Sequence, residues 1–226
     1  MEKNNEMLKT KALFTYPEHS LAYPLLSRYE YPWEALPHVS QFICELGAML
    51  SDGEYNKIGE NIWISKKATV APTASISGPC IICGDAEIRH CAFIRGNAII
   101  GAGAVVGNSV ELKNCILFDG VQVPHFNYVG DSVIGYKSHM GAGAVTSNVK
   151  SDKTPVTISC GNTRIESGLK KFGAILGDFV EVGCNSVLNP GTVIGSHSNV
   201  YPLSSVRGYV PKNSIYKARD NIVGKH

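Results

Sequence analysis

Large aliphatic residues recur at every sixth position over much of the chain. The longest run has eleven consecutive members: Ile58, Ile64, Val70, Ile76, Ile82, Ile88, Ile94, Ile100, Val106, Leu112 and Phe118. Small residues lie four positions after many of them, as at Ala68, Ala86 and Ala104. Ordinary strands would alternate with a period of two, whereas a period of six is typical of a β-helix, in which each hexad supplies one short strand and one turn.

The six-residue period shifts after Phe118 and resumes in two further runs. The first contains Tyr128, Ile134, Met140 and Thr146, and the second contains Leu176, Val182, Leu188, Ile194, Val200 and Val206. Glycine often follows the aliphatic residue, as at Gly101 and Gly107, where a larger side chain would crowd the turn. Strands of successive coils are expected to pair about 4.8 Å apart.

This repeat resembles that of the hexapeptide-transferase family. The resemblance implies an all-β fold, a left-handed parallel β-helix with three hexads in each 18-residue coil. The three runs contain 21 hexads, which correspond to about seven coils.

Several segments lie outside the repeat. The stretch Tyr31–Leu50 has apolar residues at helical spacing, and we expect its apolar stripe to pack on the prism or on a neighbouring subunit. Loops that leave a rigid solenoid are frequent functional sites. The predicted organisation is an N-terminal helical extension at 1–57, a β-helix at 58–211 with loop insertions at 123–127 and 151–173, and a C-terminal tail at 212–226.

Composition narrows the class of protein. Charged residues make up 18% and hydrophobic residues 44% of the 226 positions, which excludes a mostly disordered chain. The net charge of +2 gives no basic field for nucleic acid, and no apolar run is long enough to span a membrane. Seven cysteines in a chain of this length favour a reduced, cytoplasmic protein.

Arg95 and Lys113 are 18 residues apart, which is one coil of the prism. We therefore expect the two cations to stack at equivalent corners, where they repel each other unless an anion bridges them. A phosphate would suit such a pair, because arginine offers a planar fork and lysine a point charge. The alternative is a solvated surface pair.

His125 lies in the first interruption, and a histidine there can act as a general base near neutral pH. An isolated loop histidine is also common on protein surfaces, so this reading stays open from the residues alone. No two of the seven histidines are three to five residues apart, and Cys80 and Cys83 form the one CxxC pair. These spacings predict that no metal is bound.

The segment HFNYVGDSVIGYKSHMGAGAVTSN at 125–148 is more specific than the hexads. It resembles the acetyltransferase domain of the bifunctional N-acetylglucosamine-1-phosphate uridylyltransferases. Residue by residue, the resemblance implies a catalytic base at His125, substrate contacts at Arg95, Glu111, Lys113, Tyr128, His139 and Asn148, and coenzyme contacts at Ala142, Cys184, Pro202 and Arg219. Three positions depart from the family: His139 stands where asparagine is usual, and Cys184 and Pro202 replace small residues.

The resemblance implies an acetyl-coenzyme A-dependent N-acetyltransferase that acts on an amino-sugar phosphate such as glucosamine 1-phosphate. It also implies a homotrimer in the cytoplasm and a role in UDP-N-acetylglucosamine and cell-envelope synthesis, with no metal, nucleic acid or membrane as a partner. The nucleotidyltransferase part has no counterpart in residues 1–57. Two alternatives remain: an acyltransferase for a nucleotide-linked amino sugar, and a non-catalytic β-helix that assembles with or regulates a sugar nucleotidyltransferase.

Overall fold

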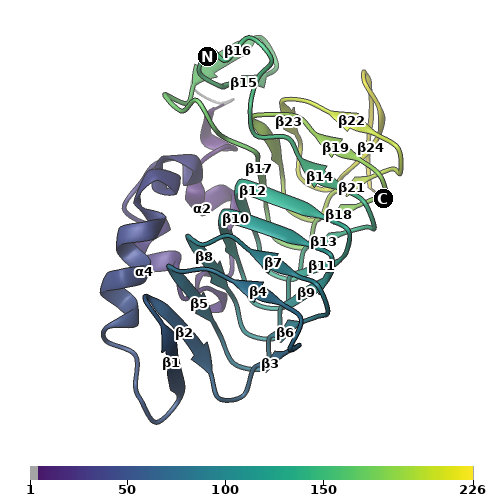
Figure 1. Cartoon of the computed structure of the whole chain (residues 1–226). Coiled ribbons are helices and arrows are strands. Elements are labelled where there is room, and N and C mark those ends of the chain that lie inside the picture. Colours follow the sequence, from purple (N-terminus) through teal and green to yellow (C-terminus); the bar gives the residue numbers. More distant parts are fainter. Residues whose placement is uncertain (1–4, 226) are drawn as a thin grey trace.

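Parallel strands stacked coil upon coil form the body of the computed structural model, which describes residues 5–225 (Figure 1). The coils build three faces, and on each face a strand pairs in parallel with the strand one coil later. The predicted all-β fold, a parallel β-helix of stacked coils, is confirmed.

The three faces are built from short strands. The first contains β2 (Ile62–Ser65), β5 (Cys80–Ile82), β8 (Ala98–Ile100), the second halves of β10 (Glu111–Leu117) and β12 (Tyr128–Ile134), β17 (Ala174–Leu176), β20 (Thr192–Ile194) and β23 (Tyr209–Val210). The second contains β3 (Thr69–Val70), β6 (Glu87–Ile88), β9 (Val105–Asn108), β11 (Gln122–His125), β13 (His139–Met140), β18 (Glu181–Val182), β21 (Asn199–Val200) and β24 (Ser214–Ala218). The third contains β4 (Ser75–Ile76), β7 (Phe93–Ile94), the first halves of β10 and β12, β14 (Val145–Thr146), β19 (Val187–Leu188) and β22 (Ser205–Val206).

At two places, successive inward residues are five positions apart instead of the predicted six, and the register of the ladder differs from the prediction there. Leu117, not Phe118, continues the ladder from Ile100, and Val129, not Tyr128, pairs with Leu112. The chain reaches Leu117 only five residues after Leu112, because β10 runs through a corner without a complete turn.

The displaced phenylalanine has a different role. Phe118 is buried and stacks on Phe14 of the N-terminal segment, with ring centroids 4.8 Å apart.

The start of the repeat is also later than predicted. Ile58 lies in β1 (Tyr55–Gly59), which is antiparallel to β2, and its side chain is exposed.

The corners leave no room for side chains at some of the glycines. A Cβ on Gly107 would lie 1.6 Å from the carbonyl oxygen of Pro124, and one on Gly101 would lie 2.4 Å from the carbonyl carbon of Phe118. Both contacts are with the backbone of the next coil, so neither can relax by a rotamer change. These two glycines therefore set how closely the coils approach each other.

The N-terminal extension is helical but interrupted. It contains α2 (Thr10–Leu13), η1 (Pro17–His19), α3 (Tyr23–Leu26), η2 (Pro32–His38) and α4 (Val39–Gly47). The predicted single helix begins as a 3₁₀ helix because Pro37 supplies no N–H for a regular α-helical bond. Phe42 and Ile43 of α4 are buried where the helix packs on β5, β8 and β10, so the apolar stripe covers the first face (Figure 1).

The two predicted loop insertions differ from each other. Residues 123–127 are not an excursion, because β11 carries the chain to His125 in register with β9. The segment 151–173 does leave the coil and contains an antiparallel hairpin of β15 (Thr157–Cys160) and β16 (Thr163–Glu166). Val156 and Ile158 are fully buried, so this hairpin is packed down rather than free in solvent.

The C-terminal segment is also ordered. β24 pairs with β21 and turns into antiparallel β25 (Asn221–Gly224), so this part of the predicted tail continues the second face and closes its end. Of the helices within residues 5–225, none is both long and apolar enough to cross a membrane.

Candidate active site

A ladder of asparagine and aspartate side chains lies at the corner between the third and first faces. Its members are Asn97, Asn114 and Asp131, all with positive φ, followed by Asn148 at the next equivalent position. The Asp131 Oδ1 accepts from the Asn114 Nδ2 at 2.9 Å, and its Oδ2 accepts from the Asn148 Nδ2 at 2.5 Å. Asp131 is 3% exposed, so these hydrogen bonds replace its water shell.

The two predicted cations stack as expected, but each has its own carboxylate. The Arg95 N–H donates to the Leu112 carbonyl next to Lys113, which places the two residues at equivalent positions of adjacent coils. The Arg95 Nη1 lies 2.6 Å from Glu111 Oε1, and the Lys113 Nζ lies 2.9 Å and 3.1 Å from the two oxygens of Asp131. The predicted repulsion is therefore compensated without a bridging anion.

These two ion pairs differ in their exposure to solvent. The Arg95 and Glu111 side chains are 46% and 35% exposed, whereas those of Lys113 and Asp131 are 24% and 4% exposed. The hydrogen bond that Arg95 donates to Glu111 raises the pKa of Arg95, which stays cationic in any case. An incoming anion could displace Glu111 far more readily than Asp131, because only the former pair is open to water.

Tyr128 and Asn148 lie together beside this ladder. The Asn148 Nδ2 donates to the Tyr128 hydroxyl at 3.2 Å as well as to Asp131. Burial raises the pKa of the half-buried Tyr128, so its hydroxyl remains protonated near neutral pH. Tyr128 pairs with Glu111 in the ladder, and the structure thus brings Arg95, Glu111, Lys113, Tyr128 and Asn148 to one face and its edge.

His125 lies at the opposite edge of the third face. Its side chain is exposed, and its ring makes no hydrogen bond to another residue within 5–225. The backbone around it is fixed by the buried Asn127, whose Oδ1 accepts the His125 N–H at 3.1 Å. The Asn127 Nδ2 donates to the carbonyls of Gly141 and Ala144 at 2.8 Å and 3.0 Å, so one amide ties the His125 corner to the corner of Ala142.

The predicted coenzyme contacts continue this same corner. His125, Ala142, Cys184 and Pro202 each lie two residues after an inward ladder residue of the second face. The carbonyls of the first three accept hydrogen bonds from the N–H groups of Gly143, Asn185 and Leu203, one coil later in each case. No residue within 5–225 accepts a hydrogen bond from the Ala142 N–H.

Arg219 lies just beyond this corner. It directly follows β24, three residues after the ladder residue Tyr216, and it is 92% exposed in the turn between β24 and β25. His139 is separate from the rest. It lies on the second face, where its Nδ1 is 2.8 Å from Glu181 Oε2. The structure therefore does not bring His139 together with Tyr128 and Asn148 within one chain.

Two residues of this region were missed by sequence reasoning. Asp131 stands in the VGD portion of the segment 125–148, and Asn127 lies between His125 and Tyr128 in the same segment. The recurrence of Asn97, Asn114, Asp131 and Asn148 at intervals of 17 residues is a signal that could have identified the ladder. No signal in the sequence shows that Asn127 faces inward, because its neighbours are polar or aromatic.

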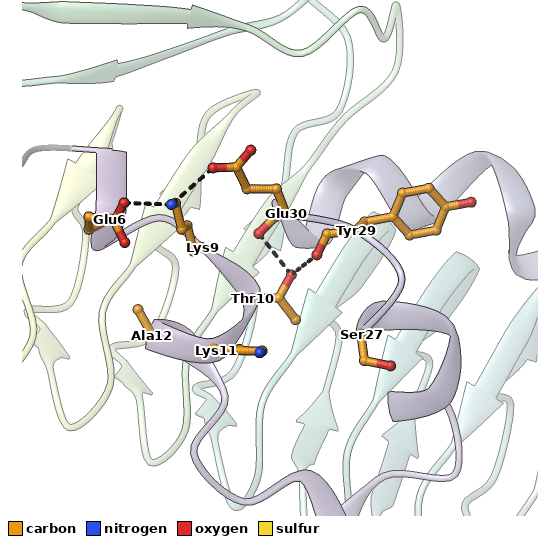
Figure 2. A pocket seen from close by; sticks show the side chains of 8 residues that line it. All are labelled: Glu6, Lys9, Thr10, Lys11, Ala12, Ser27, Tyr29 and Glu30. Carbon is orange, nitrogen blue, oxygen red and sulfur yellow. Dashed lines mark hydrogen bonds and ion pairs between the residues drawn. The ribbon is translucent and has the colours of Figure 1, made fainter. Parts of the chain in front are cut away.

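A large hollow on the described surface lies elsewhere. It has a volume of about 550 Å³ and is lined by Glu6, Lys9, Thr10, Lys11, Ala12, Ser27, Tyr29 and Glu30 of the N-terminal segment (Figure 2). Lys9 is held between Glu6 and Glu30, and the hydrogen bond that it donates to Glu6 is the main reason that its pKa rises to about 12. None of the predicted site residues lines this hollow, and residues 5–225 contain no grouping of histidine, cysteine and carboxylate side chains suited to a metal.

Comparison with known proteins places residues 76–201 in the family model described as the GMPPB C-terminal domain. The chain is 36% identical over 118 residues to the bifunctional protein GlmU of Methanococcus vannielii, covering 52% of this chain and 28% of the relative. It is 30% identical over 195 residues to the protein of the same name from Methanococcus maripaludis, covering 85% of this chain and 47% of the relative. The chain thus spans between about a quarter and a half of the length of these curated relatives.

Solved structures with a related fold are more distant in sequence. The acetyltransferase domain of PglB from Neisseria gonorrhoeae, in complex with acetyl coenzyme A, is 17% identical with a TM-score of 0.34, covering 73% of this chain and 57% of that one. PerB from Caulobacter crescentus, in complex with CoA and GDP-perosamine, is 18% identical with a TM-score of 0.26, covering 68% and 52%. These scores are too low for any conclusion about the site.

Proposed function

The chain belongs to the GMPPB C-terminal domain family, and we propose that it is an acyltransferase that moves an acetyl group from acetyl-coenzyme A to the amine of an amino-sugar phosphate. One observation carries the proposal. Five of the six side chains predicted to hold the sugar phosphate lie on one face, and His125, whose ring has no hydrogen-bond partner within residues 5–225, lies at its opposite edge. The relatives named as bifunctional GlmU proteins support the same activity.

The substrate phosphate is proposed to bind at Arg95 and Lys113. Arg95 exchanges its exposed Glu111 partner for the phosphate, whereas Lys113 keeps Asp131 and offers the remaining N–H of its ammonium group. Tyr128 and Asn148 orient the sugar hydroxyls. The fixed carboxylate of Asp131 keeps these donors in place, so substrate binding requires little reordering of side chains.

The proposed chemistry begins with removal of a proton from the substrate ammonium by the free nitrogen of His125. The neutral amine then attacks the thioester carbonyl, and a C–N bond forms as the C–S bond breaks. The Ala142 N–H, which has no acceptor within residues 5–225, donates to the carbonyl oxygen as negative charge develops there. The coenzyme A thiolate leaves and takes up the second proton of the attacking nitrogen, and the proton held on His125 passes to solvent.

The coenzyme is proposed to lie along the corner of Ala142, Cys184 and Pro202, with its phosphates toward the exposed Arg219. The family resemblance implies a homotrimer with sites between subunits. His139, which is held apart from Tyr128 and Asn148 within one chain, is proposed to contact the sugar across such an interface between subunits.

The decisive experiment incubates the protein with acetyl-coenzyme A and glucosamine 1-phosphate and measures thiol release. We expect His125→Ala to lower kcat by about 10²–10⁴-fold. Arg95→Ala should mainly raise KM, since Arg95 is proposed to act in binding. A His125→Ala variant with the wild-type kcat would refute the base assignment, and turnover with a nucleotide-linked amino sugar alone would identify the other acceptor class.

A non-catalytic role as an assembly or regulatory subunit of a sugar nucleotidyltransferase is the second candidate. It is favoured by the ion pairs, because Arg95 and Lys113 already hold carboxylates and need no substrate to balance their charge. Calorimetry with coenzyme A separates the two candidates. Binding that weakens in Arg219→Ala supports the enzyme, and the absence of binding supports the subunit.

A further inference from the structure

A cysteine, a histidine and a threonine form a hydrogen-bonded chain at the corner between the second and third faces, two coils before His125. The Cys91 Sγ lies 3.2 Å from the Nε2 of His90. The Nδ1 of the same ring lies 2.7 Å from the Thr73 Oγ1, which comes from the preceding coil. All three side chains are exposed, and no role in the proposed acetyl transfer involves any of them.

The hydrogen bonds accommodate a His90 ring that carries its proton on Nδ1. The Thr73 Oγ1 accepts the Cys91 N–H at 3.3 Å, and its second acceptor position suits the N–H of His90 Nδ1. The Nε2 then presents a lone pair to the thiol and can take its proton. A nucleophile, a base within hydrogen-bond distance and a third group that orients the base are the components of an activated nucleophile.

The other cysteines differ from Cys91 in their exposure or their surroundings. Cys80, Cys83, Cys115 and Cys160 are buried, and Cys44 is partly buried. Cys184 is exposed on the same corner, but no histidine hydrogen-bonds to its thiol within residues 5–225. The chain therefore offers two accessible thiols in similar backbone positions, only one of which has a base beside it.

We propose that Cys91 is an activated thiol that forms mixed disulfides with low-molecular-weight disulfides. His90 accepts the thiol proton, and the Cys91 sulfur attacks one sulfur of the small disulfide. A new S–S bond forms, the old one breaks, and the second half leaves as a thiolate, so no further oxidant is needed. A small thiol reverses the step by the same exchange.

The position of Cys91 gives such a modification a defined location. Strand β7 (Phe93–Ile94) lies between Cys91 and Arg95, and its exposed Phe93 pairs with Glu111 on the third face. An adduct on Cys91 would thus stand at the edge of the face that carries the polar ladder. This modification site is independent of the proposed acetyl transfer, because neither Cys91 nor His90 takes part in it.

The test follows thiol labelling of the native protein with dithiobis(nitrobenzoic acid), an aromatic disulfide whose leaving thiolate is coloured. Cys91→Ser and Cys184→Ser variants assign the two fast phases to individual thiols. At about pH 6 we expect Cys91 to react on the order of fivefold faster than Cys184, because few unassisted thiols are ionised there. Mass spectrometry should show the adduct on Cys91, and a reducing agent should remove it.

The role of the base is tested with His90→Gln and Thr73→Val. In His90→Gln, the rate at Cys91 should fall to that of Cys184, while the rate at Cys184 stays unchanged and reports that the corner is still folded. Thr73→Val keeps the side-chain shape but removes the acceptor for the ring, and should lower the rate at Cys91 in part. A native Cys91 that reacts no faster than Cys184, or a His90→Gln variant with the wild-type rate, would overturn the proposal.

Discussion

The substitution Asp131→Asn tests whether the asparagine and aspartate ladder, at the corner between the third and first faces, stabilises the fold. In the wild type, the Asp131 carboxylate accepts hydrogen bonds from Lys113, Asn114 and Asn148. Asparagine has nearly the same shape but lacks the charge, and its amide group turns two of these contacts into donor–donor encounters. The variant therefore perturbs the hydrogen bonds while leaving the packing volume almost unchanged.

The magnitude follows from the burial of the partners. Removing one member of a buried, hydrogen-bonded ion pair costs about 3–5 kcal/mol. Lys113 is 24% exposed and can regain some water, so we expect a loss of about 2–4 kcal/mol in the free energy of unfolding. For a chain of this length, that loss corresponds to a fall in Tm of about 5–10 °C, measured by circular dichroism.

The matched control is Glu111→Gln, which breaks the exposed pair with Arg95. That pair should contribute less than about 1 kcal/mol, because both side chains are well solvated. A double-mutant cycle with Lys113→Met should give a coupling energy of at least about 1 kcal/mol with Asp131→Asn. The reasoning fails if Asp131→Asn costs no more than Glu111→Gln, or if the cycle shows no coupling.

Two further predictions concern packing and titration. Gly107→Ala should prevent normal stacking and yield an unfolded or aggregated protein in a thermal denaturation assay, whereas Gly224→Ala, where a Cβ meets nothing within 4 Å, should change stability by less than about 0.5 kcal/mol. Burial raises the pKa of Asp178, which holds the N-terminal segment through Thr15. A raised native pKa means that the native state binds the proton more tightly than the unfolded state, so the stability of the wild type relative to Asp178→Asn should be greatest below about pH 4 and should decline as the pH rises through the native pKa. Urea titrations of both proteins across this range measure the difference, and a wild-type advantage that grows with pH would contradict the sign.

The sequence was sufficient to predict the coils because a solenoid repeats one simple requirement. Each inward position needs an apolar side chain, and nine of the eleven residues in the longest run, from Ile64 to Leu112, do occupy the ladder. The two errors in register arose where this requirement is ambiguous. Leu117 and Phe118 are both apolar neighbours, as are Tyr128 and Val129, so hydrophobicity alone cannot decide which of each pair points inward.

The sequence predicted those features of the candidate site that depend on the regular length of the coil, and it did not predict the others. Arg95 and Lys113 were correctly expected at equivalent corners, because stacking depends on the length of the coil. The sequence did not predict that Glu111 pairs with Arg95 or that Asp131 pairs with Lys113. Which oxygen a long cationic side chain reaches depends on rotamers and burial rather than on sequence spacing, and Asp131 became visible as the hub of the ladder only in the structure.

The register also explains how residues far apart in the chain form one corner. His125 and Ala142 are 17 residues apart, Ala142 and Cys184 are 42 apart, and Cys184 and Pro202 are 18 apart, yet all four occupy equivalent positions. The segment at 151–173 leaves the coil and returns to it in phase, so the strands on either side of it still pair directly, as β13 does with β18. Because one pairing register carries both the ladder around Asp131 and the corner of His125, a slip of one residue in β12 would displace the two edges of the third face together. The hydrogen bonds of Asn127 and Asp131, which span adjacent coils at those two edges, therefore hold the register from opposite sides of the strand that carries Tyr128.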